Sequence, residues 1–415
     1  MRLTRGTLAH AAAVLERMLR FAGPADEALS AYFRQHRALG QQERAFVAEA
    51  SFAVLRRRRS LEAAAGSAAP AALVAAAAMR VLGLSGRALE GLIDDALAQR
   101  IRAFRAETLP DAARADLPDW LWQELVAQHG KPEALCIAQG LLNAAPLDLR
   151  VNLARAGRDE VRARLARDGI EAAATLYSPA GLRLTGKPPV NRHPLFGDGL
   201  IEVQDEGSQL LAWLLGPRRG EMIADYCAGA GGKTLALAML MRGTGRVYAM
   251  DISAKRLSAL APRAARAGVT NVHSVVLAGE SDARAKRLAR KLDRVLVDAP
   301  CSGFGTLRRN PDLKWRHGPA AIAELAEKQQ GILAAASRLL RPGGRLVYAT
   351  CSILRKENEE VAERFRDSHP EYAPLSCSGL LAAQRISLDT GRNLRLWPHL
   401  HGTDGFFAAV FERSG

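Results

Sequence analysis

Apolar residues recur every three or four positions along the first 115 residues, as in Leu8, Ala12, Leu15 and Leu19. This spacing places the apolar side chains on one face of an α-helix, which is the face that packs into a protein core. Proline and glycine interrupt the pattern at intervals and divide the segment into separate helices. Residues 1–115 are therefore predicted to form an all-α domain.

The hydrophobic pattern changes between residues 116 and 200. A short helix begins near Trp120, and residues 147–152 then alternate between apolar and polar types, as a strand does. A polar helix from Arg158 to Arg167 and two short strand-like pieces follow, before Gly199. The order of these elements predicts a small α/β module over residues 116–200.

From residue 201 to residue 415, short apolar runs bounded by turn residues alternate with helical stretches. These runs cover residues 222–224, 247–250, 272–277, 295–297 and 346–349. Such alternation predicts a mostly parallel sheet with helices on both faces. Ligands of such sheets bind at the carboxyl ends of the strands, so functional residues are expected directly after each run.

The chain carries 58 Lys and Arg against 43 Asp and Glu, which gives a formal net charge of +15. An excess of this size favours a polyanionic partner, because basic side chains placed on phosphates release condensed counterions. A proteome that is generally rich in Arg and Ala is the alternative explanation. The four-arginine run from Arg56 to Arg59 leaves the same two interpretations open, RNA contact or a solvated helix face.

The five cysteines form no CxxC pair, and their number is odd. This argues against a zinc ribbon and a secreted disulfide scaffold, and it fits free thiols in a reducing cytosol. The longest uninterrupted apolar run, residues 71–79, is too short to cross a bilayer. Charged residues also interrupt the first apolar run before a signal-peptide core forms. A cytoplasmic protein without a membrane segment is expected.

A glycine-rich loop follows the first apolar run of the predicted sheet, with Gly229, Gly231 and Gly232 ahead of a helix. Glycines at a strand-to-helix turn let a ligand approach the backbone closely. A Walker phosphate loop would need glycine where Cys227 stands, and the dinucleotide fingerprint would need glycine where Thr234 stands. Both templates therefore fail by one residue.

Asp251 ends the second run of the predicted sheet. A carboxylate there can accept hydrogen bonds from both hydroxyls of a ribose, although an isolated Asp at a strand end is more often a helix cap. The loop and Asp251 together favour an adenosine-type ligand without a pyrophosphate, as in a methyltransferase.

Two cysteines lie just beyond the ends of neighbouring strands: Cys301 follows Asp298-Ala-Pro, and Cys351 follows Thr350. Adjacent strands lie about 5 Å apart, so the two thiols can face one pocket. Carbon 5 of cytosine attacks a methyl sulfonium only weakly, but a thiolate added at carbon 6 makes carbon 5 enamine-like. Asp298 is suited to meet the N3–amine edge of a cytosine taken out of its stack. Buried structural cysteines are the alternative.

The segment after Cys301 is basic and contains Arg308, Arg309, Lys314, Trp315 and Arg316. Such a segment suits an RNA strand, with phosphates on the basic side chains and a base stacked on the indole. Packing of Trp315 in a core is the equal alternative.

These blocks resemble the Sun (Fmu, nucleolar) family of RNA cytosine-5 methyltransferases. The matching segments are residues 203–209, 227–233, 298–303, 308–315, 348–352 and 404–407. The resemblance implies a Rossmann-like domain with a mostly parallel seven-stranded sheet over residues 201–415, which binds S-adenosylmethionine. It implies that Cys351 is the nucleophile on carbon 6, that Cys301 assists product release and that Asp298 contacts base and cofactor.

Residues 1–115 are similar to the NusB-like helical domain of bacterial 16S rRNA (cytosine-5) methyltransferase B, and residues 116–200 to the small RNA-binding subdomain of the family. The expected cofactor contacts are Cys227, Ala228, Gly229, Ala230, Gly231, Gly232, Lys233, Asp251, Arg256, Asp298 and one of Glu280 and Asp282. The family usually has Ala-Pro at the positions of Gly229 and Ala230, and Gly-Asp at the end of the third strand. The second departure leaves the adenine-side acid open between Glu280 and Asp282.

The sequence thus predicts a monomeric RNA (cytosine-5) methyltransferase that acts on small-subunit ribosomal RNA and needs no metal. A tRNA target is the alternative within the class, because the same motifs serve either RNA. A DNA cytosine methyltransferase uses the cysteine of its Pro-Cys motif as the nucleophile and has no second cysteine in a Thr-Cys-Ser motif. The presence of Cys351 in such a motif therefore argues against that class of enzyme. A non-catalytic ribosome-assembly factor is the alternative from another class, although both thiols are present.

Overall fold

The computed structural model describes residues 3–280 and 282–415, which form two compact units. The helical unit contains the described residues up to Ala144 together with Thr306–Pro319. The sheet unit contains Ala145–Gly305 and Ala320–Gly415.

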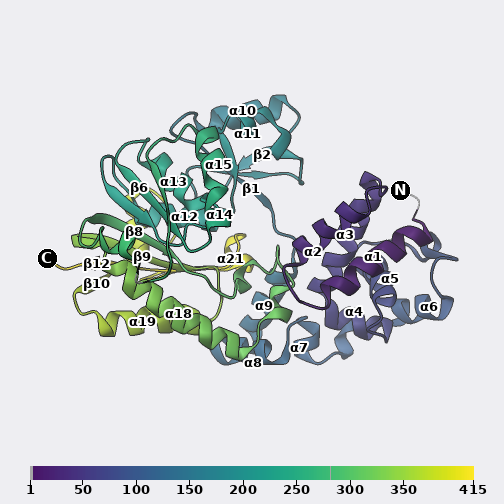
Figure 1. Ribbon diagram of the computed structural model, residues 1–415. Helices are drawn as coiled ribbons and strands as arrows, with labels where there is room; N and C mark the ends of the chain where they lie inside the picture. Colours follow the sequence, from purple (N-terminus) through teal and green to yellow (C-terminus); the bar gives the residue numbers. More distant parts are fainter. Residues whose placement is uncertain (1–2, 281) are drawn as a thin grey trace. The chain divides into compact units, whose positions relative to one another are not determined.

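The helical unit is all-α, as predicted for the N-terminal region. Its helices are α1 (Arg5–Met18), α2 (Ala25–Gln35), α3 (Gln41–Arg56), α4 (Arg58–Ala65), α5 (Pro70–Arg80), α6 (Asp95–Ala103), α7 (Asp111–Arg114), α8 (Asp119–His129), α9 (Lys131–Leu142) and α17 (Leu313–Arg316), with 3₁₀ turns η1 (Gly86–Leu89) and η2 (Ala106–Thr108). The helix α5 is buried from Ala72 to Ala78. Its small alanine side chains allow α1 and α3 to pack against it (Figure 1).

Within the described residues, no single helix is long and apolar enough to cross a membrane. The helices α4 and α5 reach that length and hydrophobicity only as a pair, and the chain bends by 102° between them.

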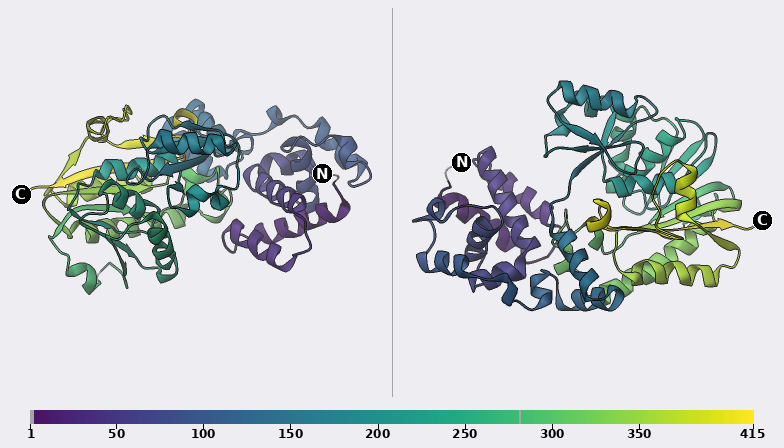
Figure 2. Two further views of the ribbon diagram at one scale, coloured as in Figure 1. Left: turned by 90° about the horizontal axis from the view of Figure 1, so that it is seen from above. Right: turned by 180° about the vertical axis from the view of Figure 1, so that it is seen from behind.

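A small antiparallel sheet begins the sheet unit. It contains β1 (Leu147–Val151), β2 (Ala172–Ala174), β3 (Gly181–Leu184) and β4 (Ile201–Val203) in the order β2-β3-β1-β4. The helix α10 (Arg158–Arg167) packs beside these strands and buries Val161 and Leu165 against Leu149 and Val151 (Figures 1 and 2). The short elements η3 (Val190–Arg192) and α11 (Pro194–Gly197) connect β3 to β4.

The large sheet carries the strand ends at which functional residues were predicted. Its strands are β5 (Met222–Asp225), β6 (Arg246–Asp251), β7 (Val272–Val276), β8 (Leu292–Asp298), β9 (Leu340–Thr350), β10 (Tyr372–Leu375), β11 (Leu394–Leu396) and β12 (Phe406–Arg413). The order is β10-β12-β9-β8-β5-β6-β7, and β11 pairs with β12. The strands β5 to β9 run parallel, whereas β12 is antiparallel to β9. The prediction of a mostly parallel sheet is confirmed, with β11 as an eighth strand beyond the seven expected.

Helices cover both faces of the large sheet, with α12 and α13 on one side and α18 and α19 on the other (Figure 1). Alternate residues of β8 therefore enter different cores: Val295 and Val297 pack with α18 and α19, and Leu296 packs with α12 and α13. The helices are α12 (Glu206–Leu215), α13 (Gly232–Leu240), α14 (Ala254–Ser258), α15 (Leu260–Ala267), α16 (Ala283–Lys286), α18 (Pro319–Ser337), α19 (Glu359–Ser368), α20 (Cys377–Ala383) and α21 (Pro398–His401), with 3₁₀ turns η4 (Phe304–Thr306) and η5 (Arg355–Glu357).

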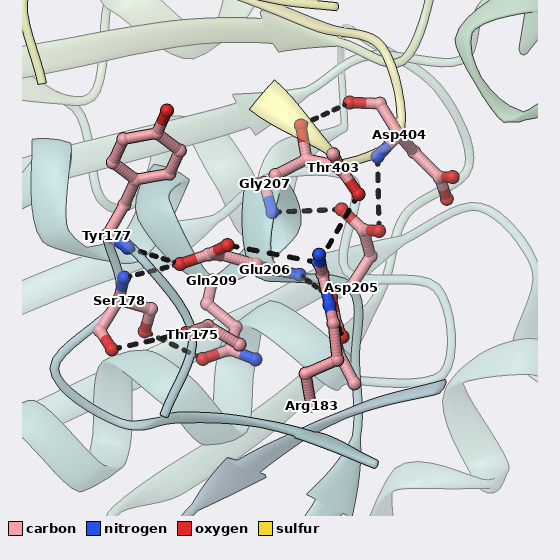
Figure 3. A network of polar contacts seen from close by, with 12 residues as sticks. Thr175, Tyr177, Ser178, Arg183, Asp205, Glu206, Gly207, Gln209, Thr403 and Asp404 are labelled. Atoms are coloured by element: carbon pink, nitrogen blue, oxygen red, sulfur yellow. Dashed lines mark hydrogen bonds and ion pairs between the residues drawn. The ribbon is translucent and has the colours of Figure 1, made fainter. Parts of the chain in front are cut away.

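A buried polar network joins the small sheet to the large one through residues 203–209 (Figure 3). Arg183 on β3 donates two hydrogen bonds of 2.8 Å to the buried carboxylate of Asp148 on β1. Glu206, at the start of α12, accepts from the backbone of Tyr177 and Ser178 at 2.6 and 2.7 Å. The small sheet is therefore fixed to the first helix of the large sheet by charge-assisted hydrogen bonds.

Candidate active site

The structure brings the two predicted thiols together at the carboxyl ends of β8 and β9. These strands pair in parallel with Asp298 opposite Ala349, so the turns that follow them lie side by side. The sulfur atoms of Cys301 and Cys351 are 3.3 Å apart, a distance at which one thiol can donate its hydrogen to the other sulfur.

Two glycines fix the backbone of the Cys351 turn. The amide of Gly305 donates to the carbonyl of Cys351 at 2.8 Å, and the amide of Gly405 donates to the carbonyl of Gly305 at 2.8 Å. A Cβ atom added to Gly305 would lie 2.1 Å from the Gly405 oxygen, so no larger residue fits between these segments. The Gly303-Phe-Gly and Asp404-Gly-Phe segments of the sequence therefore meet behind the nucleophile candidate.

Lys233 and Asp298 form an ion pair beside the two sulfurs. The Lys233 Nζ atom lies 2.6 Å from Oδ2 of Asp298. Burial by itself would lower the pKa of Lys233, but the charge and the hydrogen bond of Asp298 raise it above its ordinary value. Lys233 also lies close enough to Cys351 for the two side chains to interact electrostatically.

The pKa values of two thiols at the site, those of Cys301 and Cys227, are raised. The hydrogen bond with Cys351, burial and the negative charges of Cys351, Glu357 and Asp298 raise the pKa of Cys301 well above its ordinary value. Burial, followed by the charge of Asp298, raises the pKa of Cys227 as well. A protonated Cys301 can donate a hydrogen bond to the neighbouring sulfur of Cys351.

Asp225 is a buried acid at this site that the sequence analysis did not select. It ends β5 and accepts a hydrogen bond of 2.7 Å from the hydroxyl of Thr234, while its Oδ1 atom has no partner among the described residues. Burial raises its pKa to about 7. Its position at a strand end was the signal that could have identified it, since the same rule selected Asp251 and Asp298.

The glycine-rich loop curves tightly between β5 and α13. Gly229 and Gly231 adopt φ values of +55° and +84°, which favour glycine. A Cβ atom on Gly231 would lie 2.2 Å from Leu260, whereas one on Gly229 would meet only the Arg256 guanidinium, at 3.8 Å. Protein atoms thus fill the space beside Gly231, whereas the space beside Gly229 is open to a ligand.

Asp251 lies against this open part of the loop. Its Oδ2 atom accepts from the amide of Gly229 at 2.8 Å, and its Oδ1 atom accepts from the amide of Ser253 at 2.7 Å. Arg256 adds contacts of 3.2 and 3.3 Å through a side chain that is 60% exposed. A ribose can displace such an exposed guanidinium, so the loop and Asp251 fit an adenosine-type cofactor.

The two candidates for the adenine-side acid differ in their surroundings. Asp282 begins α16, and its carboxylate accepts from the amides of Ala278 and Arg284, both at 2.7 Å. These backbone hydrogen bonds lower its pKa. Glu280 is exposed. Asp282 is thus a helix cap, and the choice between the two acids as an adenine contact stays a prediction.

The structure favours the packing alternative for Trp315 and gives Lys314 a structural role, because both side chains have partners inside the helical unit. Lys314 is 2% exposed, and its ammonium donates to the carbonyls of Arg56 and Asp116 at 2.7 and 2.6 Å. The Trp315 indole donates to the carbonyl of Leu55 at 2.8 Å. Burial also lowers the pKa of Lys314 to about 7.

Three of the four arginines from Arg56 to Arg59 have partners inside the helical unit. Arg56 donates to the carbonyl of Arg308 at 3.0 Å, and Arg58 pairs with Glu62 at 2.7 Å. Arg59 pairs with Asp119 at 2.6 Å. Arg56 and Arg59 therefore connect segments of the helical unit that are distant in sequence, whereas the Arg58 pair lies within α4.

Comparison with known proteins identifies the family of this chain. Residues 212–412 match the family model for the 16S rRNA methyltransferase RsmB/F, and residues 117–191 match the ferredoxin-like domain of RsmF/B-like methyltransferases. The chain is 38% identical to the probable ribosomal RNA small subunit methyltransferase B of Synechocystis, over 72% of this chain and 67% of that protein. It is also 38% identical to the ribosomal RNA small subunit methyltransferase B of Sodalis glossinidius, over 77% of this chain and 72% of that protein.

Among solved structures, the crystal structure of PH0851 superimposes with a TM-score of 0.81 at 26% identity and covers all of both chains. The sheet order, the glycine-rich loop and these similarities define an S-adenosylmethionine-dependent RNA methyltransferase. The chain belongs to the RsmB/F family of 16S rRNA methyltransferases.

Proposed function

We propose that this enzyme methylates carbon 5 of a cytosine in small-subunit ribosomal RNA, with Cys351 as the nucleophile. The observation that carries the proposal is the 3.3 Å separation of the Cys301 and Cys351 sulfurs beside the Lys233–Asp298 ion pair. Two thiols in contact at strand ends suit a covalent mechanism, because one thiol can form the adduct and the other can assist its release.

In this mechanism Cys351 attacks carbon 6 of the flipped cytosine, and the electron pair of the C5–C6 double bond moves toward carbon 5. Lys233 places a positive charge near the reacting sulfur. Asp298 is held by Lys233 through Oδ2, so we assign its Oδ1 atom to the N3–amine edge of the base. S-adenosylmethionine would be held by the loop 227–233 and Asp251, with Arg256 contacting it after release from Asp251, and it would supply the electrophilic methyl group.

Release then requires loss of the carbon 5 proton to a base and rupture of the C6–S bond. The electron pair of the C5–H bond restores the C5–C6 double bond, and Cys351 leaves as a thiolate. Cys301 is protonated and 3.3 Å away, so its S–H group can donate to the leaving sulfur. Loss of Cys301 is therefore expected to trap the enzyme–RNA adduct.

The test is transfer of a labelled methyl group to 16S rRNA, with tRNA in parallel, by wild type, Cys351→Ala and Cys301→Ala. Denaturing gels detect the covalent adduct. Cys351→Ala is expected to be inactive, and Cys301→Ala to accumulate adduct. The matched control is Cys136→Ala, because Cys136 is exposed on α9 of the helical unit, whereas both site thiols belong to the sheet unit. Methylation of cytosine by Cys351→Ala would contradict the nucleophile assignment, and transfer only to tRNA would contradict the substrate.

We also propose that the helical region and the small sheet bind the RNA, and that the enzyme works as a monomer in the cytoplasm. The positive net charge supports an RNA footprint beyond the pocket. Size-exclusion chromatography of the protein alone and with an rRNA fragment tests the stoichiometry.

A further inference from the structure

A buried carboxylate links the two turns that carry the thiols. Glu357 ends η5 and is 0% exposed. Its Oε2 atom accepts from the hydroxyls of Ser302 and Ser352, both at 2.5 Å. Its Oε1 atom accepts from the amide of Ser302 at 2.8 Å and from the side chain of Gln329 at 3.1 Å.

The two serines are the residues that directly follow Cys301 and Cys351. Their hydroxyls lie 3.2 Å apart and converge on the same carboxylate oxygen. A hydroxyl is a good donor to a carboxylate, and such charge-assisted bonds are short and directional. Because each serine is one peptide bond from a cysteine, their common anchor restricts the distance between the two thiols.

The anchor is itself held from several elements. The Tyr348 hydroxyl, on β9, donates to the backbone carbonyl of Glu357 at 2.5 Å, and the side-chain oxygen of Gln329 lies 3.1 Å from the same hydroxyl. Gln329, on α18, also donates to the carbonyl of Pro300 at 2.9 Å, just before Cys301. A buried charge is costly unless its hydrogen bonds are made, and here the donors come from both cysteine turns and from the helix that covers them.

We propose that Glu357 is a positioning residue for the methyl transfer, a clamp that sets the spacing and orientation of Cys301 and Cys351 by binding the serine after each. The inference rests on the proposed function, because it assigns the spacing a role in adduct formation and release. It also accounts for the Cys-Ser pair that occurs in both turns.

The clamp has an electrostatic effect that a packing role would not have. The negative charge of Glu357 contributes to the raised pKa of Cys301, after the hydrogen bond with Cys351 and burial. Removing that charge is therefore expected to make Cys301 reactive toward iodoacetamide at lower pH. Peptide mass spectrometry follows alkylation of Cys301 separately from the other cysteines.

The experiment compares Glu357→Gln with Glu360→Gln, a matched control three positions along the chain on an exposed side chain. We expect Glu357→Gln to lower kcat by about 10²-fold, the size expected for a reacting group misplaced by about 1 Å, with KM for RNA little changed. The alkylation profile of Cys301 should shift to lower pH in the same variant. A folded Glu357→Gln enzyme with wild-type kcat, or one with reduced kcat and an unshifted Cys301 profile, would overturn the clamp.

If Glu357→Gln does not fold, Ser302→Ala and Ser352→Ala decide the question, since each removes one hydroxyl and keeps the carboxylate. Both are expected to slow the transfer, and wild-type rates in both would overturn the proposal. Cys351→Ala is measured alongside. Activity of Cys351→Ala would refute the proposed function itself, whereas an inactive Cys351→Ala with normal Glu357→Gln would refute the clamp alone.

Discussion

The guanidinium of Arg150, on β1 of the small sheet, donates a hydrogen bond of 2.8 Å to the carbonyl of Gly232, where the glycine-rich loop enters α13. Arg150 is 4% exposed, and burial lowers its pKa to about 10, so it remains a cation at neutral pH. The small sheet therefore supports the proposed cofactor loop directly, in addition to any contact with RNA.

Arg150→Ala is expected to weaken binding of S-adenosylhomocysteine by about ten- to a hundredfold, because a hydrogen bond from a charged group contributes about 1.5–3 kcal/mol. Isothermal titration calorimetry measures the change. Arg162→Ala, on the exposed side of α10, serves as the control. Equal affinities for all three proteins would show that the loop holds its shape without Arg150.

Asp225 predicts a pH-dependent stability. Its pKa is about 7 in the folded chain and 3.8 in the ordinary state, so the folded chain binds more protons between these values. Stability from this group is therefore lost as the pH rises from about 4 to about 7. Asp225→Asn should remove this pH dependence of the free energy of unfolding. The effect amounts to a few kcal/mol at about 1.36 kcal/mol per pKa unit. Thermal unfolding at pH 5 and pH 8 tests this. A difference in Tm between variant and wild type that is the same at pH 5 and at pH 8 would contradict this prediction.

The contact between Cys301 and Cys351 predicts reversible inactivation by hydrogen peroxide. One peroxide molecule oxidises the two thiols to a disulfide and is reduced to two water molecules. The sulfurs need to approach from 3.3 Å to bonding distance, about 2.0 Å, which small side-chain rotations can supply. Methyl transfer should disappear on oxidation and return with dithiothreitol. Peptide mapping that finds no link between these cysteines would rule this explanation out.

Binding of RNA is expected to depend strongly on salt. Each phosphate neutralised by Lys or Arg releases counterions, so the logarithm of the association constant falls linearly with the logarithm of the salt concentration. Filter binding of an rRNA fragment between 50 and 300 mM salt measures the slope, and a flat response would contradict an electrostatic footprint.

The large sheet could be predicted from sequence because its apolar runs and turn residues report local structure. The same logic located Asp251, Cys301 and Cys351 at strand ends, where the structure places them. The fate of Lys314 could not be predicted, because burial of a basic residue depends on carbonyls of Arg56 and Asp116 that are distant in sequence.

Glu357 was missed for a similar reason. It lies in Arg-Lys-Glu, a segment with the composition of a solvent-exposed turn, and only tertiary packing brings Ser302 and Gln329 to its carboxylate. Hydrophobic periodicity carries no information about such polar convergence.

The membership of Thr306–Pro319 in the helical unit affects how this enzyme can be recombined with its relatives. The chain leaves the Cys301 turn, contributes Lys314 and Trp315 to the helical unit, and returns to form α18. A chimera that exchanges only the first 144 residues would pair a foreign helical scaffold with the native segment 306–319. The backbone carbonyls that accept from the buried ammonium of Lys314 would then be supplied by a backbone that was not selected to fit it. Functional hybrids are expected only when both segments are taken from the same parent.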